Sequence, residues 1–172
     1  MKQAVYEFSR PLQVDRVPNL GSRDRPAADE AECAALALRL GIPKLYSLSA
    51  FLTSSPWRGG GLKITGPMKA EFDQVSVVSL DTFRTKLEVD VERFFLPPHK
   101  DANANEDDVD TIQNGIVDLG EILAETMALE LDPYPRKPGE VFEDIQEDVE
   151  PDKITPFAKL SKLKSALQGG EK

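Results

Sequence analysis

The sequence contains one cysteine, one histidine and one tryptophan among 172 residues. A single cysteine, Cys33, excludes an intrachain disulfide and a zinc site built from thiolates, and we expect it to be buried on a helix. The single histidine, His99, follows two prolines, which predicts an exposed loop residue. Histidine metal clusters and Ser-His triads would all depend on this one side chain. The sequence therefore predicts a non-enzymatic protein with no catalytic residue, no metal site and no cofactor.

Long apolar runs are also absent. No stretch approaches the roughly 20 apolar residues that cross a bilayer. The N-terminal segment has no apolar core of the kind found in signal peptides, because Glu7 and Arg10 interrupt it. We therefore expect a cytoplasmic protein with no membrane partner.

The net charge of −9 is distributed unevenly along the chain. Residues 101–152 carry seventeen acidic and two basic side chains, whereas residues 153–172 carry one acidic and five basic ones. A negative chain is a poor general binder of polyanions, and no DNA partner is expected. Because the acidity is confined to one block, the net charge says little about contacts made by the strands or by the C-terminal end.

The clearest predicted helix covers residues 118–131. Asp118 has the side chain of an N-cap, and Glu121 follows at the spacing of a capping box. Pro133 cannot continue a helix and marks its end. The residues that recur on its apolar side are Leu119, Ile122, Leu123 and Met127. Such a face needs a sheet or another helix to cover it.

A second helix is predicted over residues 26–40. Pro26 is suited to the first turn of a helix, and Gly41 is suited to the position that follows the last turn. The expected buried stripe consists of Ala31, Ala34, Ala35 and Leu38, widened by Leu36 and Leu40.

Three strands are predicted over residues 44–53, 62–78 and 83–95, with an edge strand near residues 3–14. Alternation of apolar and polar residues assigns their inward positions. These positions are Tyr46, Leu48, Ala50 and Leu52 in the first strand, Leu62, Ile64, Met68, Ala70 and Phe72 in the second, and Phe83, Leu87, Val89 and Val91 in the third. Strands this close in sequence pair antiparallel, with the glycines at 59–61 as a hairpin turn.

Together these elements predict a single α+β domain over residues 1–152. Its antiparallel β-sheet has about four or five strands and is packed by the two main helices. Residues 99–110 are predicted to form a flexible acidic loop. Residues 153–172 are predicted to form a basic amphipathic C-terminal tail.

Three segments carry a resemblance to a known family: Gln74–Phe83, Asp118–Pro135 and Pro156–Lys164. Their characteristic residues are Ser76, Ser79, Leu80, Phe83, Asp118, Leu119, Pro156, Phe157 and Leu160. In this order, the segments resemble the YceD family, the large ribosomal RNA subunit accumulation proteins, in its alphaproteobacterial form. The resemblance extends over nearly the whole chain.

One feature departs from that family. Many members carry a Cys-x-x-Cys pair where this sequence has Ser76 and Ser79. A serine hydroxyl is a poor ligand for zinc, so a metal at this pair is not expected here. The resemblance implies a non-catalytic role in the accumulation or processing of large-subunit (23S) ribosomal RNA, and hence in ribosome assembly.

Two groups of basic residues are candidates for contact with RNA or a partner. The first is the tail, with Lys159, Lys162 and Lys164, although its apolar residues could instead dock on the protein's own core. The second is the outward strand face, with Lys63, Lys69, Arg84 and Lys86. Carboxylates on the same face could cancel its potential. The turn at Trp57 could stack on an exposed base or pack locally.

Two functions remain open from the sequence. In the first, the chain binds the large-subunit rRNA precursor or pre-ribosomal particles. In the second, its acidic block, residues 101–152, is an adaptor surface for a basic ribosomal protein or an RNA-processing enzyme. The same block contains a run of carboxylates at 106–110 that lacks the order of a calcium-binding loop, so we interpret it as a solvated charged segment.

Overall fold

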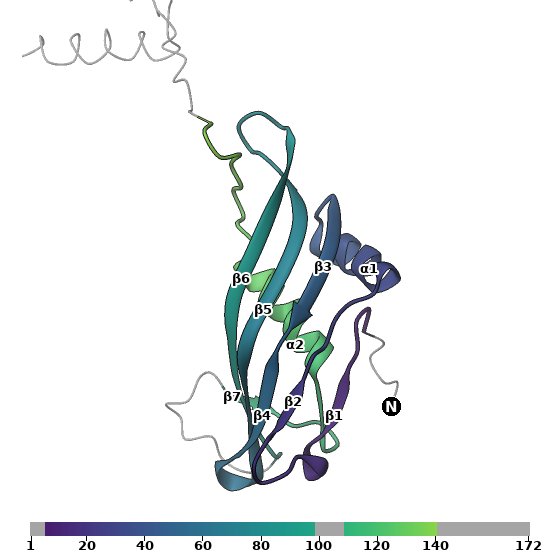
Figure 1. Cartoon of the computed structure of the whole chain (residues 1–172), viewed down its shortest axis with the longest axis vertical. Helices are drawn as coiled ribbons and strands as arrows, with labels where there is room; N and C mark the ends of the chain where they lie inside the picture. Colours follow the sequence, from purple (N-terminus) through teal and green to yellow (C-terminus); the bar gives the residue numbers. More distant parts are fainter. Residues whose placement is uncertain (1–5, 99–108, 141–172) are drawn as a thin grey trace, which may run out of the picture. The chain divides into compact units, whose positions relative to one another are not determined.

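The computed structural model describes residues 6–98 and 109–140, which all lie in one compact unit, Met1–Glu140 (Figure 1). A second unit, Val141–Lys172, lies outside the described residues, as do residues 99–108. The predicted tail and nearly all of the predicted acidic loop therefore fall outside the described part. The elements are β1 (Pro11–Gln13), β2 (Ser22–Asp24), α1 (Glu30–Leu40), β3 (Lys44–Ala50), β4 (Leu52–Trp57), β5 (Gly61–Val75), β6 (Thr82–Leu96), β7 (Val109–Thr111), β8 (Ile116–Asp118) and α2 (Leu119–Glu130).

The main sheet has six strands in the order β2-β4-β5-β6-β7, with β3 also paired to β5. All of its pairs are antiparallel except β6 with β7, and β1 and β8 form a separate antiparallel pair. This confirms the predicted α+β fold with two helices and a mostly antiparallel sheet. The sheet exceeds the expected four or five strands because β2 and β7 have only three residues each, too few to show an alternating pattern.

The side chains of the long β5–β6 hairpin alternate between an inner and an outer face of the sheet. The inward residues predicted for β5 are all buried: Leu62, Ile64, Met68, Ala70 and Phe72. On β6, Val91 is buried and the other predicted inward residues are half-buried. Figure 1 shows α2 behind these strands and α1 beside β3. Both helices pack on the inner face of the sheet. No described element covers the outer face.

The predicted strand 44–53 is wrong in its extent. It is interrupted at Phe51 and continues as β4 to Trp57, with both parts pairing with β5. A register shift between Leu45 and Ser47 also reverses the expected orientation of Tyr46. Leu45 is buried in its place, and Tyr46 is 36% exposed. A bulge adds one residue to one strand, and simple alternation cannot account for it.

The predicted start of the first helix is also wrong, and of its expected buried stripe only Leu36 is buried. The helix begins at Glu30, where Asp29 and Glu32 form a capping box. Its buried residues are Cys33, Leu36 and Ala37, whereas Leu38 is 86% exposed. Apolar residues occur all around this helix, so its periodicity alone cannot select the side that packs. Gly41 ends the helix with φ 67°, as predicted.

The second helix confirms Asp118 as the N-cap, because its Oδ1 accepts hydrogen bonds from the amides of Gly120 and Glu121. Glu121 does not complete a capping box. Its carboxylate instead pairs with Arg39 of α1 at 2.6 Å. Gly120 is buried, and a Cβ there would lie 2.4 Å from the carbonyl oxygen of Phe8, so this position requires glycine. The predicted strand 3–14 shortens to β1, and Phe8 is a core residue just before it.

Candidate functional site

The outer sheet face collects the four basic strand residues that the sequence selected. Lys63 and Lys69 lie at alternate positions of β5, and Arg84 and Lys86 lie at alternate positions of β6. Each points away from the buried positions between them. The prediction that these four side chains share one face therefore agrees with the strand register.

Most of these cations are paired on the same face. Lys63 contacts Glu92 at 2.7 Å, Lys69 contacts Glu88 at 2.8 Å, and Arg84 lies 3.6 Å from Asp73. Lys86 stands opposite Glu71 in the strand register. Surface pairs of this kind contribute little to stability, roughly 0–1 kcal/mol, so a phosphate can take the place of the carboxylate at small cost.

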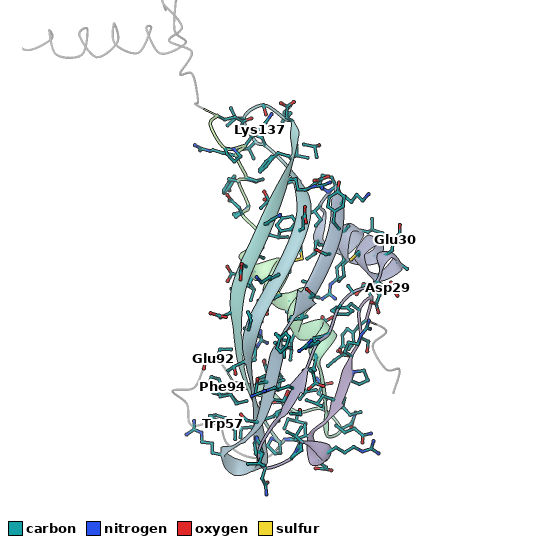
Figure 2. All side chains as sticks on the ribbon, viewed as in Figure 1. Asp29, Glu30, Trp57, Glu92, Phe94 and Lys137 are labelled. Atoms are coloured by element: carbon teal, nitrogen blue, oxygen red, sulfur yellow. The ribbon has the colours of Figure 1, made fainter. Side chains whose placement is uncertain are left out.

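Aromatic rings accompany these cations at one end of the face. The rings of Trp57 and Phe94 lie 4.9 Å apart, tilted by 47°. The guanidinium of Arg58 lies 4.4 Å from the Trp57 ring, and Lys63 Nζ lies 5.0 Å from that of Phe94. Figure 2 places Trp57, Phe94 and Glu92 along one side of the sheet. Trp57 thus packs locally, as one of the two interpretations held, and it remains partly exposed.

Two further rings continue the series along the sheet. Tyr46 lies between two cations, with Arg84 at 3.7 Å and Lys44 at 4.7 Å from its centroid. The guanidinium of Arg25 lies 4.0 Å from the centroid of Phe51. Both rings are exposed, by 36% for Tyr46 and 43% for Phe51. We call these four side chains, Tyr46, Phe51, Trp57 and Phe94, the aromatic row.

Of the aromatic row, sequence reasoning identified only Trp57. Phe94 could have been found, because it lies at an outward position of the alternating strand β6. Tyr46 and Phe51 could not, since one lies at the bulge of β3 and the other at the break between β3 and β4.

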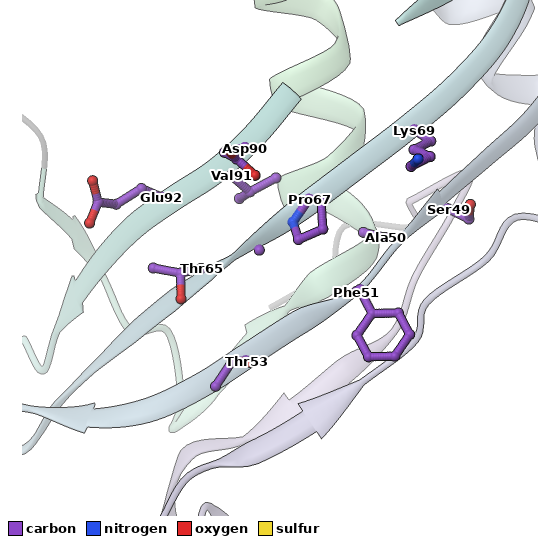
Figure 3. Close-up of a pocket in the computed structure, with 11 residues that line it drawn as sticks. Ser49, Ala50, Phe51, Thr53, Thr65, Pro67, Lys69, Asp90, Val91 and Glu92 are labelled. Carbon is purple, nitrogen blue, oxygen red and sulfur yellow. The ribbon is translucent and has the colours of Figure 1, made fainter. Parts of the chain in front are cut away.

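A hollow of about 720 Å³ opens on the outer face at the break between β3 and β4 (Figure 3). Its lining residues come from β3, β4, β5 and β6, and from Phe51 between β3 and β4. The residues that line it are Ser49, Ala50, Phe51, Thr53, Thr65, Gly66, Pro67, Lys69, Asp90, Val91 and Glu92.

A second polar cluster closes the other end of the hairpin. The predicted strand 62–78 stops at Val75, and residues 76–81 form the loop to β6. The hydroxyls of Ser76 and Ser79 donate to the two carboxylate oxygens of Glu140. The amide of Val77 donates to the carbonyl of Pro135 at 2.9 Å. The two serines therefore hold residues 135–140 against the loop, through bonds that need no metal.

The carboxylate of Glu140 also accepts the amide of Lys137 at 3.1 Å. The hydrogen bonds from Ser76 and then Ser79 lower the pKa of Glu140 below its ordinary value. Hydrogen bonds to a carboxylate favour its charged form.

The remaining motif residues within the described ranges have structural roles. Leu80 lies in the hairpin loop with φ 61° and is 76% exposed, while Phe83 is half-buried in β6. Asp118 caps α2 and Leu119 is buried in its first turn. The motif and contact residues that fall outside the described residues are Pro156, Phe157, Leu160, Lys159, Lys162 and Lys164.

The potentially reactive side chains in the described part of the chain form no catalytic or metal-binding arrangement. Cys33 is buried, as predicted, and burial raises the pKa of its thiol, which disfavours the reactive thiolate. Within residues 6–98 and 109–140, no group of three His, Cys, Asp or Glu side chains could hold a metal ion. His99 lies outside these ranges.

Residues 64–164, more than half of the chain, match the model of the family described as large ribosomal RNA subunit accumulation protein YceD. The chain belongs to the YceD family. The matched range contains β6, α2 and all of the motif residues that carried the resemblance. No curated protein and no solved structure matches the chain.

Membership of the YceD family gives the chain a role in ribosome biogenesis, in the accumulation of the large ribosomal RNA subunit. Neither helix in the described part is long and apolar enough to cross a membrane.

Proposed function

We propose that this YceD-family protein is a cytoplasmic, non-catalytic ribosome-assembly factor that binds the large-subunit rRNA precursor, or a pre-ribosomal particle, through its outer sheet face. The observation that carries the proposal is the aromatic row. Four partly exposed rings lie on a sheet face that no described element covers, and each has a lysine or arginine within 5.0 Å of its own ring or of the ring beside it.

Such a face suits unpaired RNA. Bases in loops and single strands stack on aromatic side chains and guanidinium planes, with about 1–3 kcal/mol per stacked base. Lysines and arginines beside the rings neutralise phosphates and make binding salt-dependent. A double helix keeps its bases stacked internally and offers no free base to these rings.

Acidic side chains on the same face limit its positive potential. Glu88, Asp90 and Glu92 alternate along β6, so the face is not uniformly positive. General attraction to any polyanion is therefore weak, which favours selective stacking over non-specific binding. The lysines of the tail, Lys159, Lys162 and Lys164, would supply a second contact with phosphates in this proposal.

The fluorescence of Trp57 tests the proposal directly, because it is the only tryptophan in the chain. The full-length protein would be titrated with a single-stranded RNA of about twelve nucleotides, within the site sizes of known single-strand binders, and with its duplex. We expect quenching by the single strand, weaker binding of the duplex and loss of affinity as salt rises. Phe94→Ala should weaken binding about tenfold, whereas Tyr134→Ala, which removes an exposed aromatic ring outside the sheet, should not.

The acidic adaptor is the alternative function. The acidic block, residues 101–152, would then bind a basic ribosomal protein or an RNA-processing enzyme. Absence of RNA binding, together with salt-sensitive binding of a lysine- and arginine-rich ribosomal protein, would favour this alternative. Loss of RNA binding in Tyr134→Ala but not in Phe94→Ala would contradict the outer face as the RNA site.

A further inference from the structure

The hollow on the outer face results from the break between β3 and β4. Gly66 and Pro67 of β5 stand opposite Phe51, and the Phe51 amide donates to the Pro67 carbonyl at 2.9 Å. A Cβ at Gly66 would lie 1.9 Å from the carbonyl oxygen of Phe51, so only glycine permits this approach. The sheet therefore stays continuous across the break while the hollow has a floor of backbone and the Pro67 ring.

The rim of the hollow has two chemically different sides. Figure 3 shows the ring of Phe51 on one side and the carboxylates of Asp90 and Glu92 on the other. The hydroxyls of Thr53 and Thr65 stand at one end, and Lys69 stands at the other. An occupant must therefore combine a flat apolar surface with hydrogen-bond donors on its edge.

The two carboxylates differ in what they already contact. Glu92 is 2.7 Å from Lys63. Asp90 has no ion-pair partner among the residues described in the structure and is exposed. Ionised carboxylates accept hydrogen bonds and donate none. Asp90 is thus the acceptor in the hollow that a donor on the ligand can reach without displacing an existing pair.

The hollow lies between the two ends of the aromatic row. In the register of β5, Arg84 with Tyr46 lies near Asp73, and Phe94 lies opposite Lys63. The hollow, at residues 65–69 of β5, falls between these two ends. An extended strand of RNA that stacks on the rings at both ends must pass over it.

We propose that the hollow holds one unstacked nucleotide of the bound RNA, with its base against Phe51 and its amino edge toward Asp90 and Glu92. This inference rests on the proposed RNA-binding function. Cytosine, adenine and guanine carry an exocyclic amino group that can donate to a carboxylate. Uracil has none, and its one edge donor, N3–H, lies between two carbonyl oxygens that repel a carboxylate. The hollow therefore selects against uracil at this point of the sequence.

The size and surroundings fit this occupant. The hollow, about 720 Å³, lies within the range of small-molecule pockets, roughly 300–1,000 Å³. It has room for a base with its ribose and for bridging water. Lys69 at the rim, 2.8 Å from Glu88, can exchange that carboxylate for the phosphate of the same nucleotide.

The test compares oligocytidine and oligouridine of equal length, because both are pyrimidines and differ mainly in the edge that faces the carboxylates. Binding to the full-length protein would be measured by Trp57 quenching and by anisotropy of labelled RNA. We expect oligocytidine to bind about tenfold more tightly, the scale of one good edge contact. Asp90→Asn supplies a donor as well as an acceptor, so it should reduce this ratio to near one.

Glu88→Gln is the matched control, since it removes one negative charge from the same strand at a position that does not line the hollow. It should raise the affinity for both oligomers and leave their ratio unchanged. Because both positions are exposed, we expect each variant to keep the thermal unfolding midpoint of the unaltered protein, which shows that it is folded.

The outcomes of these experiments distinguish failure of this inference from failure of the proposed RNA-binding function. RNA binding without preference for cytidine, or a preference that Asp90→Asn retains, would overturn the inference and leave the proposed function standing. Absence of binding to every RNA, with binding of an arginine-rich peptide that Asp90→Asn abolishes, would overturn both and assign the hollow to a protein partner.

Discussion

The buried hydroxyl of Ser76 donates a hydrogen bond to the carboxylate of Glu140, 64 residues further along the chain. Ser76 Oγ also accepts the amides of Val78 at 3.1 Å and Ser79 at 3.4 Å, so one hydroxyl shapes the loop and fastens it. The hydroxyl of Ser79 donates to the other oxygen of the same carboxylate. The Glu140 carboxylate, which accepts both hydroxyls, therefore links the hairpin loop to the segment after α2.

Replacing Glu140 by Ala should release residues 135–140 from the hairpin loop. The amide of Val77, which donates to Pro135, should then exchange with solvent several-fold faster, because opening of this region no longer requires loss of the carboxylate bonds. Hydrogen exchange followed by mass spectrometry measures this directly. Glu130→Ala, at the exposed end of α2, is the control and should leave exchange in the loop unchanged. Equal exchange in the two variants would contradict the role of Glu140.

The same contact should depend on pH. The hydrogen bonds lower the folded-state pKa of Glu140 below its ordinary value of 4.5. Its contribution is therefore complete above about pH 4.5, the value expected in the unfolded chain, and is lost as the pH falls through the lower folded value. NMR titration of the Glu140 carboxyl carbon should show the lowered midpoint, and the Val78 amide should shift with it. In Glu140→Gln, that amide transition should disappear, and its persistence would assign it to another group.

Gly66→Ala should be far more damaging than its size suggests. The added Cβ would meet the Phe51 carbonyl, and the φ of +148° is one that other residues rarely adopt. We expect a loss of about 3 kcal/mol or more, or failure to fold. Gly41→Ala is the matched control, since its φ is also positive but nothing lies within 4 Å, and should cost about 1 kcal/mol. Urea unfolding compares the two, and similar losses would contradict the close packing of Phe51 on Gly66.

The proposed contacts with ribosomal particles can be divided between the tail and the sheet. Tagged protein should co-sediment with large-subunit precursors at low salt and less at moderate salt. Changing Lys159, Lys162 and Lys164 to alanine should reduce the sedimenting fraction several-fold if the tail contacts phosphate. The matched variant removes the same charge from the sheet, at Lys63, Lys69 and Lys86. Sedimentation that neither variant reduces would contradict both contacts, and migration only as free protein would contradict the assembly role.

Local chemistry made much of this fold predictable. Asp118 caps α2 because its carboxylate directly precedes an apolar helical pattern, and both features lie within a few residues. The inward residues of β5 follow from strict alternation over a long strand. Where the pattern was ambiguous, as in the alanine- and leucine-rich α1, the buried side depended on what packs against it, and the sequence-based stripe was wrong.

The candidate site also has features that local sequence patterns predict and features that depend on the tertiary structure. The sequence by itself determined that Lys63, Lys69, Arg84 and Lys86 share one face, because the side chains of a strand alternate with a period of two. Only the tertiary structure decided that Tyr46 and Phe51 join that face, since a bulge and a strand break turn them outward. It alone also brought Glu140 to Ser76 and Asp90 to the hollow. Those contacts join residues far apart in the chain or on different strands, and no local pattern records the register that makes them neighbours.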